Sequence, residues 1–327
     1  MKLIAPIRSL QQYPILKESG AQELYGGIWL SESGRVSEYN RRGNFGEQAN
    51  FTDFNELAQV IEYCCDDGIP FYLTMNAIYT PVAQKPLIKD ILKHYRACGG
   101  KKVIVSNEDM LTLAREADCE ITISSCAGIS NRFSAEYWVK AGAERLILPR
   151  SVTFAQIRSF RQYLPANVEI ETFMMNTMCK FSDSMCRSLH NTEYGALCAF
   201  IDHSQKKYVL LDGQELTGRE AIPMCTNGYL YQQLYTGNKS FGCGHCALWE
   251  LFQAGVDSVK IVGRLLDADV LANQIRLTRR NMQIAAECHS KDEYLHRMES
   301  VQRLMGNDIC RNGFQCYYRE ARTERHA

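Results

Sequence analysis

Cysteine is the residue type whose number and spacing in this sequence point most directly to chemistry. The chain has 14 cysteines in 327 residues, and a dense group lies between residues 175 and 246: Cys179, Cys186, Cys198, Cys225, Cys243 and Cys246. Thiolates bind iron–sulfur clusters or zinc. Cys243-x-x-Cys246 alone suggests zinc, but no second CxxC follows at zinc-finger spacing. The grouping therefore predicts a thiolate metal site, and a loop with incidental thiols is the alternative.

The other cysteines are read differently. Cys64, Cys65, Cys98 and Cys119 lie on or beside predicted helices and strands, where a free cysteine usually serves as a small buried hydrophobe. Cys126 ends a predicted strand, so a role in a site remains open. His245 lies inside the CxxC and could be a metal ligand or a proton carrier. An exposed loop histidine is the favoured alternative.

The segments that must position these residues alternate short β-branched runs with longer amphipathic stretches. We expect strands at 3–6, 23–28, 70–76, 102–106, 120–125, 145–150, 168–173 and 258–264, each followed by a helix. Ser106 with Asp109 and Thr153 with Gln156 resemble capping boxes that start two of these helices. Such alternation implies a parallel sheet with helical crossovers. Eight units suit an α/β fold of the (β/α)8 TIM-barrel type, typically ~250 residues long. A doubly wound open sheet is the alternative.

We expect one domain over residues 1–290, with the cysteine-rich insertion after the seventh strand at about 175–246. Residues 291–327 are expected to form a charged tail that packs as one more helix or frays. A first insertion spans 29–51. Both insertions follow strands, so both should lie over the C-terminal mouth of the barrel, where barrel enzymes carry their active sites. Long loops in a compact domain are usually functional.

The predicted strand ends supply the candidate residues of that mouth: Tyr25, Asn76, Ser124, Arg150, Phe173 and Arg264. Arg150, Arg264 and Asn76 are the catalytic candidates. Together with Lys260, the two arginines could bind a carboxylate, since the guanidinium fork matches carboxylate geometry. A structural ion pair at a strand end is the alternative for either arginine, and the sequence does not decide whether Lys260 points into the barrel.

Composition limits the other function classes. Lys+Arg and Asp+Glu are 37 each, so the net charge is zero, which argues against a protein held mainly by phosphate charge. Arg276, Arg279 and Arg280 are explained better as a solvated helix face than as a nucleic-acid site. No apolar run approaches the ~20 residues of a membrane span, and the first residues lack the apolar stretch of a signal peptide. We therefore expect a cytoplasmic protein without a membrane partner and do not favour a nucleic-acid partner.

The spacing around the seventh strand resembles a known signature. Glu171-Thr172-Phe173, then five residues, Cys179, six residues and Cys186 resemble the collagenase-like peptidase family. Its members include ubiquinone-biosynthesis proteins and RNA-hydroxylation factors, and the likeness is greatest to the ubiquinone branch. The resemblance extends over about residues 2–285 and includes further segments at 3–6, 20–27, 49–51, 148–150 and 254–264.

The resemblance implies a [4Fe–4S] cluster held by Cys179, Cys186, Cys198 and Cys225, with Cys243 and Cys246 as alternates. It also implies oxygen-independent hydroxylation of a small molecule or biosynthetic intermediate, with prephenate as oxygen donor and a related family member as heterodimer partner. The chain departs from the family at three places near the mouth. Val262 replaces the usual carboxylate before Gly-Arg, Ser151 replaces a glutamate, and Met174-Met175-Asn176 replaces a His-Gly type segment.

Three alternative functions remain open. A peptidase would follow the family's name, but the sequence has no His-Glu-x-x-His and no Gly-x-Ser-x-Gly. A Cys–His dyad could involve His190, His203 or His245. The other two alternatives are a non-catalytic, cluster-bearing partner subunit and an RNA-base hydroxylation factor.

Overall fold

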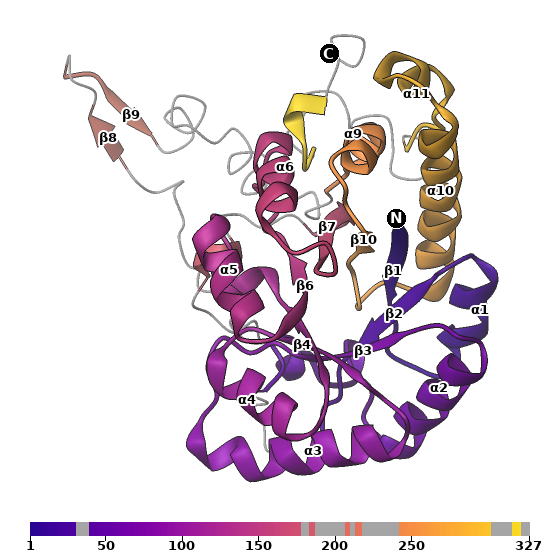
Figure 1. Ribbon diagram of the computed structural model, residues 1–327, viewed down its shortest axis with the longest axis vertical. Coiled ribbons are helices and arrows are strands. Elements are labelled where there is room, and N and C mark those ends of the chain that lie inside the picture. Colours follow the sequence, from indigo (N-terminus) through magenta and orange to yellow (C-terminus); the bar gives the residue numbers. More distant parts are fainter. Residues whose placement is uncertain are drawn as a thin grey trace.

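The fold is a closed barrel of eight parallel strands, which confirms the predicted (β/α)8 architecture (Figure 1). The computed structural model describes residues 1–30, 39–177, 183–186, 207–209, 213–217, 242–301 and 316–321. In chain order the barrel strands are β1 (Lys2–Pro6), β2 (Glu23–Gly26), β3 (Phe71–Met75), β4 (Lys102–Val105), β5 (Glu120–Ile123), β6 (Ala143–Ile147), β7 (Glu169–Met175) and β10 (Ser258–Ile261). Strand β1 closes the ring by pairing with both β2 and β10.

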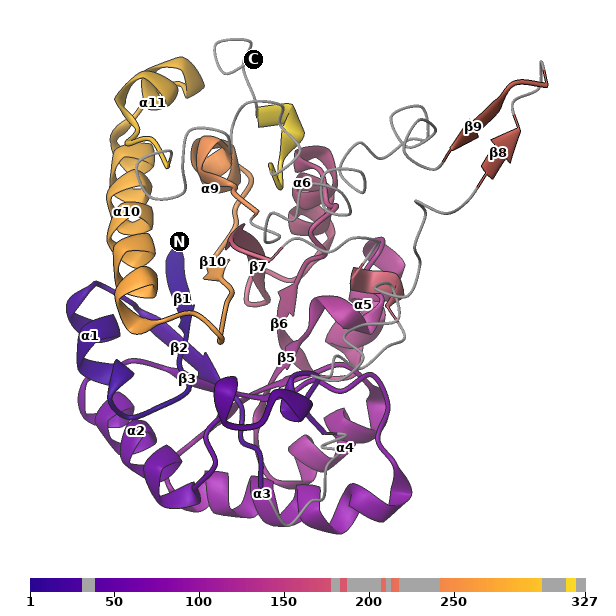
Figure 2. The same cartoon turned by 180° about the vertical axis from the view of Figure 1, so that it is seen from behind.

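Helices surround the barrel, as the views from opposite sides show (Figures 1 and 2). They are α1 (Gln12–Glu18), α2 (Phe54–Asp66), α3 (Lys85–Ala97), α4 (Glu108–Glu116), α5 (Arg132–Lys140), α6 (Phe154–Tyr163), α9 (Leu248–Gln253), α10 (Ala268–Glu287) and α11 (Lys291–Arg297). Their apolar faces cover the strands because an amphipathic helix buries its stripe against the sheet. In the described residues no helix is both long and apolar enough to cross a bilayer.

The helix starts test two capping predictions. Thr153 caps α6, and the reciprocal bonds with Gln156 confirm that capping box. The prediction for α4 is wrong by one residue: the side chain of Asn107 accepts the amide of Met110 at 2.9 Å. Ser106 donates instead to the carbonyl of Asn76 at 3.1 Å. Asparagine and serine are both good N-caps, so the residue type did not decide between Ser106 and Asn107. The end of β4 at Val105 places Asn107 at the cap position.

The last residues of the cysteine-rich insertion pack against the C-terminal end of β7. The amide of Asn176 donates to the carbonyl of Gly242 at 2.8 Å, and the amide of Gly244 donates to the carbonyl of Met174 at 2.8 Å. Cys243 also pairs with Cys316 in a parallel bridge. The phenol of Tyr318 donates to the carbonyl of Phe173 at 3.0 Å. Residues 316–321 thus pack directly on the strand that begins the insertion. Within the insertion, β8 (Lys207–Val209) and β9 (Glu215–Thr217) form an antiparallel pair.

A buried ionic network fills one end of the barrel interior. Arg145 on β6 donates two bonds to Glu23 on β2, at 2.7 and 2.8 Å, and one to Glu171 on β7 at 3.0 Å. Its side chain is 2 % exposed, and those of Glu23 and Glu171 are 1 % and 0 % exposed. Buried charges persist only when they are paired and hydrogen-bonded. The network therefore joins three strands across the barrel.

His245 is fully buried, so the expectation of an exposed loop histidine is wrong. Its Nδ1 lies 2.8 Å from Asn281 Nδ2, and its Nε2 lies 3.2 Å from Thr278 Oγ1. The hydroxyl of Thr278 donates to the carbonyl of Gln274 at 2.7 Å. This network assigns a neutral ring that accepts at Nδ1 and donates from Nε2. Both nitrogen atoms are therefore engaged by α10.

We expect His245 to make the protein less stable as the pH falls. Burial lowers the pKa of the imidazole from 6.5 to about 3. The unfolded chain therefore binds one more proton than the folded chain between these values, and folding free energy is lost at ~1.4 kcal/mol per pH unit. Urea unfolding at pH 7, 6 and 5 measures this loss. The His245→Gln variant should show a shallower dependence, and an imidazole that titrates near 6.5 by NMR would contradict the assignment.

Candidate functional site

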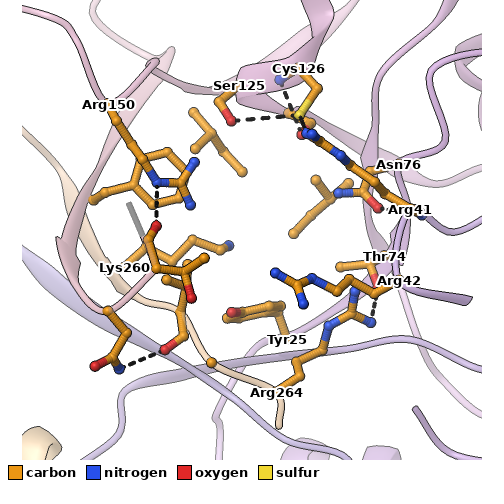
Figure 3. Close-up of a pocket in the computed structure, with 18 of the residues that line it drawn as sticks. Tyr25, Arg41, Arg42, Thr74, Asn76, Ser125, Cys126, Arg150, Lys260 and Arg264 are labelled. Atoms are coloured by element: carbon orange, nitrogen blue, oxygen red, sulfur yellow. Dashed lines mark hydrogen bonds between the residues drawn. The ribbon is translucent and has the colours of Figure 1, made fainter. Parts of the chain in front are cut away.

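A cavity opens at the C-terminal mouth of the barrel, with a volume of about 480 Å³ (Figure 3). The structure brings every strand-end candidate to its wall: Tyr25, Asn76, Ser124, Arg150, Phe173 and Arg264. Strand register causes this convergence, because parallel strands in a closed barrel all end at the same rim. The first insertion contributes Arg41 and Arg42, so its expected place over the mouth is confirmed for its described residues.

Arg264 is held by neutral groups. Its Nη1 donates to Asn50 at 2.9 Å and to Thr74 at 3.2 Å, and its Nη2 donates to Asn40 at 3.2 Å. Gly27 leaves room for this arrangement, since a Cβ there would overlap Asn40 and Arg264. No carboxylate in the described part of the chain pairs with Arg264, so the alternative of a structural ion pair is wrong for it there.

Arg42 lies beside Arg264 and Tyr25 (Figure 3). Burial, together with the repulsion of neighbouring arginines, lowers the pKa of each of the two guanidinium groups to about 10. Burial and this repulsion mean that each positive charge is held at a cost in free energy. A bound anion would remove that cost, because an opposite charge favours the protonated form.

Arg150 does form a structural ion pair. Its Nη1 donates to Asp183 at 2.7 Å, and its Nε donates to the carbonyl of Thr177 at 2.9 Å. The guanidinium carbon lies 3.7 Å from the centroid of the Phe173 ring. Asp183 belongs to the cysteine-rich insertion, so Arg150 ties that insertion to the barrel rim while still lining the cavity.

Lys260 points into the barrel, a direction that the sequence left open. Its Nζ donates to Glu171 at 2.9 Å and lies 3.9 Å from the centroid of the Tyr25 ring. Burial lowers the pKa of this amine, and the Glu171 carboxylate opposes that shift. Lys260 therefore connects the cavity floor to the Arg145 network.

Arg41 lies between two thiols at the cavity wall. Its Nη2 donates to the sulfur of Cys186 at 2.9 Å, and its Nη1 contacts the sulfur of Cys126. Its backbone amide donates to Asn76 Oδ1 at 3.3 Å. Asn76 thus serves to position Arg41 as well as to line the cavity (Figure 3).

The predicted cluster ligands are only partly within the described residues. Cys186 lies against Arg41, whereas Cys179, Cys198 and Cys225 lie outside the described residues. The alternates Cys243 and Cys246 are not among the described residues that line the cavity. No group of three or more His, Cys, Asp or Glu side chains suited to a metal ion occurs within the described ranges.

The three family departures lie at different distances from the cavity. Val262 and Asn176 line it, and Asn176 Nδ2 donates to the Val262 carbonyl at 2.7 Å. Ser151 is exposed. The apolar Val262 leaves the wall beside Arg264 without a carboxylate at that position. This substitution keeps the cavity more positive than a carboxylate would.

Sequence reasoning missed Arg41 and Arg42 as site residues. They lie in a polar loop without apolar periodicity, where no strand or helix pattern assigns a direction to a side chain. A usable signal was nevertheless present: an Arg-Arg pair between Asn40 and Asn50, inside an insertion that follows a strand. Cys126 was recognised only as a residue whose role remained open.

Comparison with known proteins now identifies the family. The sequence profile of peptidase family U32 matches residues 8–325. tRNA hydroxylation protein P1 of Bacillus subtilis is 23% identical over 95% of this chain and 68% of its own length. tRNA hydroxylation protein P2 of the same organism is 24% identical over 76% of this chain and 80% of its own length.

A further relative carries a protease name. The collagenase of Porphyromonas gingivalis is 23% identical over 58% of this chain and 45% of its own length, so the chain spans less than half of that protein. Among solved structures, the U32 peptidase Mk0906 matches with 14% identity and a TM-score of 0.40, over 53% of this chain and 68% of its own. The relatives named here do not test the expected likeness to the ubiquinone branch, which stays a prediction. The match over nearly the whole chain shows that this protein belongs to peptidase family U32, the collagenase-like family.

Proposed function

We propose that this protein is an iron–sulfur enzyme of family U32 that performs oxygen-independent hydroxylation with an anionic oxygen donor. The observation that carries the proposal is the positive cavity at the barrel mouth, lined by Arg41, Arg42, Arg150, Lys260 and Arg264. A low-dielectric cavity of one charge sign concentrates ligands of the opposite sign. Redox chemistry in such a cavity is also shielded from water by the barrel walls.

The donor that fits this cavity is a small carboxylate. In the described residues, no carboxylate forms an ion pair with Arg42 or Arg264, so both guanidinium groups can serve a ligand. Two guanidinium groups side by side suit a molecule with two carboxylates, because each fork can bind one of them. Prephenate has this chemistry and is the donor that the family resemblance implies.

The cluster is proposed on Cys179, Cys186, Cys198 and Cys225, with Cys243 and Cys246 as alternates. Cys186 suits this role because it is partly buried and its sulfur accepts a hydrogen bond from Arg41, a residue that lines the cavity, at 2.9 Å. When bound, a [4Fe–4S] cluster supplies electron transfer or Lewis-acid chemistry. The protein's own residues bind the donor through Arg42 and Arg264, hold the insertion through Arg150 and exclude water with Phe173 and Val262.

The acceptor that we propose is a tRNA base, because the two Bacillus relatives are named for tRNA hydroxylation. A free small molecule is the second candidate, and the balanced charge of the chain, with 37 residues of each sign, favours it. A heterodimer with a second family member is also proposed. Peptidase activity receives less support, since no histidine occurs among the described residues that line the cavity.

Metal analysis under strict exclusion of oxygen tests the cluster. About four irons and four sulfides per chain are expected, with a broad absorption band near ~400 nm. Alanine substitution of Cys186 should deplete the iron, whereas substitution of Cys64, which is buried on α2, should not. Zinc alone, or no metal, would overturn the cluster.

An oxygen-transfer assay then tests the reaction. The iron-loaded protein is incubated without oxygen with prephenate labelled at its hydroxyl oxygen, in parallel with unmodified tRNA and with tRNA-free metabolite extracts. Mass spectrometry should find the labelled oxygen in a nucleoside. Labelled oxygen found only in a small molecule would show that the acceptor is that molecule and not a tRNA base. Cleavage of gelatin without oxygen transfer would favour peptidase activity.

A further inference from the structure

Lys260 is a buried amine at the cavity to which the proposed donor site assigns no chemical step. It lies on β10 in register with Phe173 on β7, and both side chains line the cavity. The residue is 5 % exposed, and Figure 3 shows its amine directed toward the open centre of the cavity. The amine therefore serves Glu171 on one side and is placed to meet a bound ligand on the other.

The surroundings of this amine suit a nucleophile. Burial lowers the pKa of Lys260, and the positive charge of Arg145 acts in the same direction, while the Glu171 carboxylate opposes both. The Nζ of Lys260 donates to Glu171 at 2.9 Å, so Glu171 is placed to take a proton from the ammonium group. Desolvation and a neighbouring cation are the two conditions that activate a lysine for attack on a carbonyl carbon.

The same neighbours stabilise the product of such an attack. A protonated imine carries one positive charge, as the ammonium group does, so its pairing with the Glu171 carboxylate is kept. The face of the Tyr25 ring, whose centroid lies 3.9 Å from Nζ, attracts either cation. The phenol of Tyr25 donates to the carbonyl of Ile261 at 3.3 Å, which holds the ring in this place. The buried network therefore keeps its charge balance through the reaction.

Arg42 and Arg264 select the class of carbonyl compound. Both line the same cavity, and both interact electrostatically with Tyr25, the ring that Lys260 contacts. A 2-oxo acid carries a carbonyl carbon next to a carboxylate, so one molecule can meet the amine and a guanidinium fork together. The proposed donor belongs to this class, because prephenate carries a 2-oxo carboxylate.

We propose that Lys260 forms a reversible imine with the carbonyl carbon of a 2-oxo acid bound in the cavity. The ammonium group gives one proton to Glu171, the nitrogen attacks the carbonyl carbon, and a second nitrogen proton moves to the carbonyl oxygen. Glu171 then returns its proton to that hydroxyl group, which leaves as water when the C=N bond forms. Nothing is oxidised or reduced. This inference rests on the proposed function, because it deepens the proposed donor site.

Reductive trapping tests the imine, because cyanoborohydride reduces a protonated imine to a stable amine. Anaerobically purified wild type is incubated with cyanoborohydride and either pyruvate or prephenate. The intact mass should rise by the mass of the acid less one oxygen atom, and peptide mapping should place the modification on Lys260. Lys260→Arg keeps the charge but forms no imine, so it should lose the adduct. Arg264→Met should lower the yield at subsaturating pyruvate about tenfold, the loss expected for one charged hydrogen bond.

Lys102→Arg is the matched control. Lys102 also pairs with a carboxylate, that of Glu120, and its Nζ lies 5.6 Å from the centroid of the Tyr72 ring, but it is not among the residues that line the cavity. This variant should be trapped as wild type is. Thermal unfolding shows whether each variant is folded, and the mapped peptide of the wild type identifies the site if Lys260→Arg does not fold.

Titration calorimetry with prephenate separates the inference from the proposed donor site. Binding of prephenate without an adduct on Lys260 would overturn the inference and leave the donor site standing. Equal trapping of butanone, which has no carboxylate, would overturn the assignment to 2-oxo acids. A wild type that binds neither acid would defeat the donor site and, with it, the inference.

Discussion

Replacing Arg145 with methionine is expected to lower the free energy of unfolding by about 3–5 kcal/mol, the loss typical of removing one partner from a buried ion pair. Arg145 is the shared partner of Glu23, Glu169 and Glu171, whose remaining cationic partners among the described residues are Lys2 and Lys260. Methionine fills a similar volume, so lost charge and not a cavity dominates the effect. Equilibrium urea unfolding at pH 7 measures it.

The pH dependence of this loss provides an internal check. Despite the opposing effect of burial, Arg145 and Lys2 hold the pKa of Glu23 below its usual range. The stability that Glu23 contributes is therefore present above its unfolded pKa and is lost as the pH falls through the folded value. In Arg145→Met the unpaired carboxylates can take up protons as the pH falls, which removes their buried charge. The difference in unfolding free energy between wild type and the variant should therefore shrink between pH 7 and pH 4.

Arg280→Met is the matched control, because Arg280 pairs with Glu299 on the surface with 66 % of its side chain exposed. Exposed pairs contribute little to stability, so this variant should unfold close to wild type. Equal losses in the Arg145 and Arg280 variants would show that the buried network does not hold the barrel together.

Replacing Arg264 with methionine is expected to weaken the binding of prephenate by about 10- to 100-fold. Hydrogen bonds to charged groups contribute about 1.5–3 kcal/mol, and about 1.4 kcal/mol corresponds to a tenfold change in affinity. Arg264 lies in the cavity wall and is held by Asn40, Asn50 and Thr74 and by no acid among the described residues. Titration calorimetry on the iron-loaded protein measures the change directly.

The pH profile of binding distinguishes a charge effect from a general disturbance. The pKa of Arg264 and that of Arg42 are each lowered to about 10. Anion binding needs the protonated groups, so wild-type affinity should fall as the pH rises toward 10, and Arg264→Met should fall less steeply. Arg276→Met, on the exposed face of α10, is the control and should bind as wild type does. Unchanged affinity for prephenate in folded Arg264→Met would show that the donor does not bind in this cavity.

The sequence by itself determined the barrel and the place of its mouth. Eight alternations of β-branched and amphipathic segments leave few other arrangements, because each parallel strand needs a crossover and each helix needs a face to cover. The six strand-end residues meet at one cavity for the same reason. The Thr153 capping box was readable because its bonds are local in sequence.

Interactions between distant segments were decided only by the tertiary structure. Arg41 belongs to a loop without periodicity, and its position between Cys126 and Cys186 depends on three segments that meet only in the folded chain. Arg145 looks like one charged residue in a strand, and only the closed ring brings Glu23 to it, 122 residues away. Local patterns constrain the backbone, whereas charge pairing and side-chain direction depend on the neighbours that closure of the barrel provides.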